Sequence, residues 1–95
     1  MMPDCDKLRH EILSVLSKTS STTFRELRSD LENAFNLSPE ERTKRTASDA
    51  ELLMSSLMHR ELESLVRDGL VIKLTRSDWQ LTESGREAVK ARRDG

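Results

Sequence analysis

The sequence has little that would support a secreted, metal-binding or membrane-inserted protein. It contains one cysteine, Cys5, so the chain has neither an internal disulfide framework nor a metal site of several cysteines. A lone cysteine usually behaves as a small apolar residue, and it is typical of proteins in a reducing compartment. No apolar run reaches membrane-spanning length, and no signal-peptide core follows Met1. We therefore expect a cytoplasmic protein with no membrane partner.

The sequence also lacks an excess of either charge. Sixteen Lys and Arg residues stand against seventeen Asp and Glu residues, which gives a net charge of −1. Balanced charge provides no overall attraction to nucleic acid, although a local basic patch is compatible with it. Hydrophobic residues make up 35% of the chain and recur with a regular period, which indicates a folded protein. A chain of 95 residues predicts one domain with a modest core and no deep cleft between lobes.

Helix-start signals divide the first two thirds of the chain. An apolar stripe predicts the first helix and consists of Cys5, Leu8, Ile12, Val15 and Leu16. The TSSTT run then suggests a short extended piece. A capping box at Thr23 predicts a helix over residues 24–36. A second box at Ser38 predicts a single turn that opens a basic inter-helix loop, residues 38–47. A third box, Ser48 with Glu51, predicts a long helix to about Asp68, where Gly69 supplies a left-handed stop.

The long helix is predicted to have two different faces. Its apolar side consists of Met54, Leu57, Met58, Leu62 and Leu65. Its polar side consists of Ser56, His59, Arg60, Glu63 and Arg67. Leu52 falls on the polar side, which is an anomaly in this assignment.

The last third of the chain predicts a hairpin and a helix. The segment GLVIKLT is predicted to be a strand with Leu70, Ile72 and Leu74 on one face, and RSD to be a turn. Trp79 and Leu81 are predicted to form the inner face of the return strand. A two-stranded hairpin is unstable alone in water, so the hairpin over residues 70–82 must lie on the helices as a wing. Thr82 then ends the hairpin and caps a last helix over residues 83–93. We therefore predict a mainly α fold with a small β-hairpin (α+β), a winged helix over residues 1–95.

The segment GLVIKLTRSDWQLTESGREAV resembles the close of winged-helix domains, where a Gly-Leu step, a hairpin and an aromatic-x-Leu-Thr-x-x-Gly run recur. The chain is most similar to the amino-terminal domain of Mrr-type restriction endonucleases. The similarity rests on LSPEER (37–42), on the Leu65, Gly69 and Leu70 pattern and on Trp79, and it covers roughly residues 8–89. No nuclease segment follows, so we do not expect cleavage chemistry. About eleven residues, 37–47, separate the second and third helices, where a compact helix-turn-helix has only a few.

The resemblance implies binding of double-stranded DNA, with the third helix in the major groove and the wing on the backbone or minor groove. The candidate contacts are Ser56, His59, Arg60 and Arg67 on the helix, Lys73 and Arg76 on the wing, and Arg42, Lys44 and Arg45 in the loop. Lys and Arg side chains neutralise phosphates, and Arg or His can reach base edges.

The other residues with reactive side chains do not form a pattern that indicates an enzyme. His10 and His59 are isolated, so we expect no metal or other cofactor, and the sequence has no nucleophile motif. Two functions stay open: a DNA-binding module, as a small regulator or accessory subunit, and a winged-helix adaptor that mediates protein interaction or dimerisation without nucleic acid. The balanced charge and Leu52 favour the adaptor, whereas the ERTKR loop and the wing favour DNA. A thin apolar strip on the last helix, Ala88, Val89 and Ala91, either caps the domain or meets its copy in a homodimer.

Overall fold

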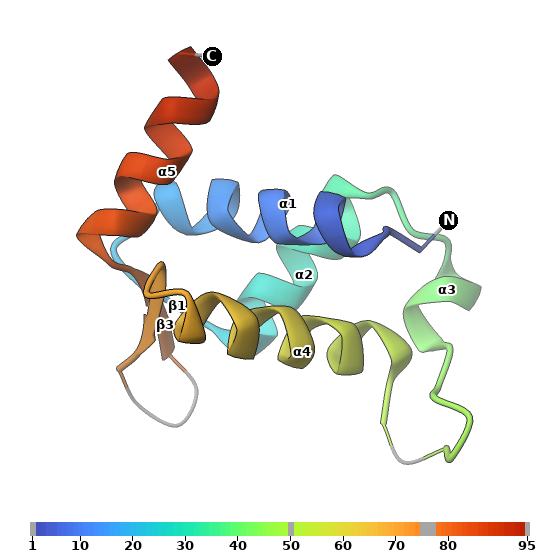
Figure 1. Ribbon diagram of the computed structural model, residues 1–95. Coiled ribbons are helices and arrows are strands. Elements are labelled where there is room, and N and C mark those ends of the chain that lie inside the picture. Colours follow the sequence, from blue (N-terminus) through green and yellow to red (C-terminus); the bar gives the residue numbers. More distant parts are fainter. Residues whose placement is uncertain (1, 50, 75–77, 95) are drawn as a thin grey trace.

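The computed structural model describes residues 2–49, 51–74 and 78–94. Its elements are α1 (Cys5–Ser17), β1 (Thr22–Thr23), α2 (Phe24–Ala34), α3 (Pro39–Thr43), α4 (Leu53–Arg67), β2 (Val71–Lys73), β3 (Asp78–Leu81) and α5 (Glu83–Asp94). In Figure 1, α1 lies above α4, the small sheet stands at one end of α4, and α5 rises from the sheet past the end of α1. This is the α+β winged-helix arrangement that the sequence predicted.

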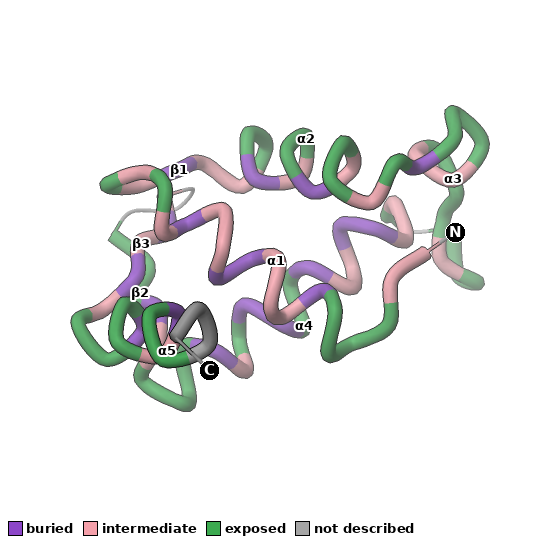
Figure 2. Tube along the Cα trace, turned by 90° about the horizontal axis from the view of Figure 1, so that it is seen from above, coloured by how far each residue is buried: buried purple, intermediate pink, exposed green. Residues whose placement is uncertain are grey.

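The core lies between α1, α2 and α4. Nine side chains from these three helices are at most 1% exposed: Leu8, Ile12, Leu16, Leu27, Leu31, Met54, Met58, Leu62 and Leu65. In Figure 2 the buried stretches of the three helices face one another. Burial of each such side chain contributes about 1.5–3 kcal/mol, so this core fixes which face of α4 points outward.

The apolar stripe predicted for α1 needs one correction. Cys5 is exposed, because it is the first residue of the helix and lies beyond the reach of α2 and α4. Leu8 is the first α1 side chain that enters the core, and Leu13 supplies a further buried position. Asp4 caps the helix by accepting a hydrogen bond from the Lys7 amide (2.8 Å).

The sheet has three strands in the order β1-β3-β2, so the TSSTT run does contribute a short strand. Trp79 and Leu81 are buried as predicted, with exposed fractions of 6% and 3%. On the opposite strand, the apolar face formed by the alternation of Ile72 and Leu74 is not the face that packs on the core. Val71 is buried and pairs with Leu81, whereas Ile72 and Leu74 are 42% and 48% exposed.

The shift in β2 follows from the way α4 ends. Gly69 adopts a left-handed conformation (φ 77°), and the Leu70 amide still donates to the Leu65 carbonyl (3.0 Å). This is the hydrogen-bond pattern of a glycine-terminated helix. Leu70 therefore belongs to the helix-ending turn, and Val71 becomes the first strand residue that faces the core.

The start of α4 also differs from the prediction. The helix begins at Leu53, because Asp49 has a positive φ (58°), which a right-handed helix does not allow. The segment from Lys44 to Leu53 instead doubles back on itself. The Leu53 amide donates to the Lys44 carbonyl (2.7 Å), and Arg45 pairs with Leu52 in an isolated β-bridge. Leu52 is thus the residue just before the helix, which removes the anomaly of an apolar side chain on a polar helix face.

The capping box predicted at Ser38 and the capping role predicted for Thr82 are confirmed. Ser38 and Glu41 form a reciprocal capping box at the start of α3. At the far end of the chain, the Thr82 hydroxyl donates to the Gly69 carbonyl (2.6 Å) and accepts from the Gly85 amide (3.0 Å), while the Thr82 amide donates to the Leu70 carbonyl (3.0 Å). Thr82 therefore joins the end of the sheet, the end of α4 and the start of α5 in one small network.

Candidate nucleic-acid interface

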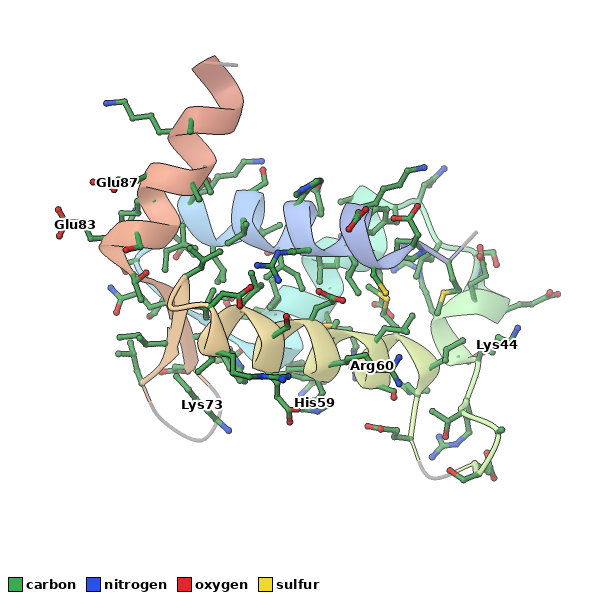
Figure 3. All side chains as sticks on the ribbon, in the orientation of Figure 1. Lys44, His59, Arg60, Lys73, Glu83 and Glu87 are labelled. Atoms are coloured by element: carbon green, nitrogen blue, oxygen red, sulfur yellow. The ribbon has the colours of Figure 1, made fainter. Side chains whose placement is uncertain are left out.

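The exposed face of α4 is the centre of the candidate interface. His59, Arg60, Glu63 and Arg67 are exposed and Ser56 is half-buried, so the structure brings the predicted helix residues together on one face. In Figure 3, Lys73 lies at the wing end of α4 and Lys44 near its opposite end, with His59 and Arg60 between them. The same view shows Glu83 and Glu87 on α5, pointing away from α4. A row of cationic side chains therefore extends along the length of α4.

A groove separates α4 from the wing. It has a volume of about 330 Å³ and is lined by His59, Glu63, Val66, Arg67, Lys73 and Trp79. The ammonium group of Lys73 lies 5.2 Å from the centroid of the Trp79 ring, a cation–π contact that holds it beside the groove. Arg76, the second wing candidate, lies outside the described residues.

An aromatic stack fixes the orientation of His59. Its imidazole lies against the ring of Phe24, with centroids 4.2 Å apart and an angle of 12° between the ring planes. Phe24 is the first residue of α2, whose start is set by the Thr23 cap. The stack could not be predicted from the sequence, because Phe24 and His59 are far apart in the chain and have only ordinary helical spacing within their own helices.

The three basic residues of the loop differ in how far they are engaged. Arg42 donates from Nε to the Leu37 carbonyl (2.9 Å) and from Nη2 to Asn33 Oδ1 (3.2 Å). Arg45 forms an ion pair with Asp49 (2.9 Å). Lys44 is exposed, and within the described part of the chain its side chain has no ion pair. Lys44 is therefore the loop cation with the most freedom to meet a ligand.

The start of α4 adds a partial positive charge beside Lys44. Among the described residues no side chain caps this helix, and its first turn contains no acidic residue. The first amide groups of a helix carry a partial positive charge and attract anions. The bridge between Arg45 and Leu52 holds the basic loop next to these amides.

The described residues contain neither a metal-ligand cluster nor a membrane-spanning helix. No group of three His, Cys, Asp or Glu side chains within residues 2–49, 51–74 and 78–94 could hold a metal ion. None of the described helices is long and apolar enough to cross a membrane. The groups gathered on α4, the wing and the loop include cations, backbone amides, one stacked imidazole and the Glu63 carboxylate.

Comparison with known proteins identifies the family but no individual relative. No curated protein and no solved structure matches the chain. The family model described as the Mrr N-terminal domain matches residues 6–91, which is nearly the whole chain. The chain therefore belongs to the Mrr N-terminal domain family.

Proposed function

We propose that this chain is a DNA-binding module without catalytic activity, and that it contacts double-stranded DNA through α4, the wing and the loop before α4. The main support for this proposal is a row of side chains along the exposed face of α4 and at its two ends: Lys44, His59, Arg60, Arg67 and Lys73. Membership of the Mrr N-terminal domain family supports it.

The dimensions of α4 fit the major groove. Its 15 residues give a length of about 22 Å, and the groove of B-DNA admits one α-helix. With α4 in the groove, Lys44 and Lys73 at its two ends would face the flanking phosphates. His59 and Ser56 would then lie nearer the base edges, and the stack on Phe24 would present the His59 ring at low entropic cost. In this arrangement Arg42 holds the loop, and Arg45 contributes a charge already reduced by Asp49.

The expected affinity follows from the number of cations that no carboxylate of the described residues neutralises. Lys44, Arg60, Arg67 and Lys73 form no ion pair with another described residue. If these cations meet four phosphates, log K falls with log salt with a slope of about −3.6. Without base recognition the dissociation constant would be on the order of 10⁻⁴–10⁻⁶ M.

Charge-removal variants test the location of the interface. The double variant Lys44→Ala, Lys73→Ala should weaken binding to every duplex and reduce the magnitude of the salt slope by about 1.8, because two phosphate contacts are lost. The control Lys7→Ala, Lys90→Ala removes the same charge at exposed positions on α1 and α5. Fluorescence anisotropy with labelled duplexes should show little change for the control. Equal weakening by both double variants would contradict the proposed interface.

A second candidate function, the protein-interaction adaptor, is favoured by a groove between α1 and α2. It has a volume of about 550 Å³, and its lining includes three carboxylates, Glu11, Glu26 and Asp30, with a single base, Lys18. This groove suits a basic helix, from a protein partner or from a second copy of this chain. Sedimentation equilibrium would then show a dimer that Glu26→Lys, Asp30→Lys converts to monomer, whereas a wild-type monomer at high concentration would argue against it.

A further inference from the structure

Glu63 is a carboxylate placed among the cations of the interface. It is exposed on α4 and lines the groove together with His59, Arg67 and Lys73. His59 precedes it by one helical turn and Arg67 follows it by one turn, so both are at the spacing of helical side-chain pairs. Even so, within the described residues no hydrogen bond or ion pair engages Glu63. The carboxylate is thus available to a ligand at the centre of a surface that otherwise attracts anions.

DNA offers such a carboxylate only one kind of favourable partner. Phosphates repel it, and the major-groove atoms of guanine (N7 and O6) and thymine (O4) are hydrogen-bond acceptors. The amino groups of cytosine (N4) and adenine (N6) are donors that a Glu side chain can accept from. Opposite a keto base the carboxylate would lose water without gaining a hydrogen bond, which is a costly arrangement for a charged group.

We propose, on the basis of the DNA-binding function proposed above, that Glu63 determines specificity by selecting an amino base, adenine or cytosine, over a keto base at one position of the bound strand. This inference deepens the proposed function, because it assigns the position at which α4 reads sequence rather than phosphate.

Val66 supplies an apolar contact beside Glu63. Its side chain is 42% exposed and lines the same groove, one turn beyond Glu63. An apolar side chain complements the C5-methyl group of thymine, so Val66 favours a thymine in the base pair next to the amino base. Adenine carries its N7 acceptor beside N6, which repels a carboxylate, so cytosine opposite Glu63 is preferred to adenine.

The test uses a selected sequence and single-pair variants of it. Selection of wild-type protein from a random duplex library gives the bound sequence, and anisotropy then measures duplexes that carry each of the four base pairs at every position. At one position wild type should favour amino over keto bases by about 10- to 150-fold, which corresponds to about 1.5–3 kcal/mol for one charge-assisted hydrogen bond. Glu63→Ala should bind all duplexes more tightly yet discriminate by only a few fold, and alanine is used because glutamine would itself pair with adenine. Val66→Ala should keep the amino preference and lose the preference for a neighbouring thymine.

The outcomes separate this inference from the function on which it rests. If Glu63 only repels phosphates, Glu63→Ala strengthens binding by the same factor on every duplex and the assignment is overturned. Wild-type protein that binds all four base pairs equally at every position overturns the assignment alone. Failure to bind any duplex at low salt overturns the proposed function as well. Glu87→Ala, the same change at an exposed site on α5, is the control and should leave discrimination unchanged.

Discussion

Substitution of Gly85 by alanine tests the junction that defines the end of the fold. A Cβ atom at Gly85 would lie 2.1 Å from the Leu70 carbonyl oxygen and 3.0 Å from a methyl group of Leu81. The first of these contacts is with backbone, so no side-chain rotation can relieve it. The start of α5 must therefore move away from the Gly69–Leu70 step.

This movement puts three hydrogen bonds at risk, all of them centred on Thr82. Each of these hydrogen bonds stabilises the fold by about 1 kcal/mol. The higher helix propensity of alanine relative to glycine offsets at most about 1 kcal/mol of the loss. We therefore expect Gly85→Ala to lower the free energy of unfolding by about 2 kcal/mol. For a chain of this size that corresponds to a fall in Tm of about 8–16 °C.

Thermal and urea unfolding monitored by circular dichroism would measure the loss. Ser84→Ala is the matched control, because Ser84 is the exposed neighbour in the same helical turn and should change stability by less than about 0.5 kcal/mol. If Gly85→Ala proved as stable as wild type, the close approach of α5 to Leu70 would be refuted. The explanation of the direct junction between β3 and α5 at Thr82 would then be refuted as well.

Three further substitutions test the packing of the wing and the loop. Trp79→Ala should lower the free energy of unfolding by about 3–5 kcal/mol, since Trp79 is 6% exposed. Unchanged denaturant stability would contradict the burial of the wing. Val71→Ala should cost about 1.5–3 kcal/mol, whereas Ile72→Ala should cost less than about 0.5 kcal/mol, and the reverse order in urea unfolding would restore the strand face predicted from the sequence. Arg42→Ala should lower stability by about 1–3 kcal/mol, because Arg42 bonds the Leu37 carbonyl and Asn33, yet leave the salt slope of DNA binding unchanged. A smaller salt slope with full stability would show that Arg42 contacts phosphate instead.

Local signals that depend on neighbouring residues predicted much of the fold. The capping box at Ser38 and the role of Thr82 were confirmed, because each depends on residues within three positions in the chain. The predicted buried face of α4 was confirmed for Met54, Met58, Leu62 and Leu65, whereas Leu57 is only half-buried and Ser55 and Glu61 are buried as well.

The sequence-based predictions failed where a local pattern was overridden by a contact or turn that the pattern does not include. Ser48 and Glu51 have the spacing of a capping box, but the pairing of Arg45 with Leu52 and the conformation of Asp49 keep that segment out of the helix. The alternation of Leu70, Ile72 and Leu74 was misread, because the turn at Gly69 extends through Leu70. The stack of Phe24 on His59 and the engagement of Arg42 depend on tertiary packing, which periodicity does not encode.

The salt dependence of duplex binding tests the central claim most directly. Wild-type protein is titrated into a labelled duplex at several salt concentrations between about 50 and 200 mM, a range over which phosphate contacts produce large changes in affinity. With four cations at the interface that form no ion pair with another described residue, we expect log K to fall against log salt with a slope of about −3.6. Absence of binding at the lowest salt, or binding with a slope near zero, would contradict the proposal that this chain holds DNA through α4, the wing and the preceding loop.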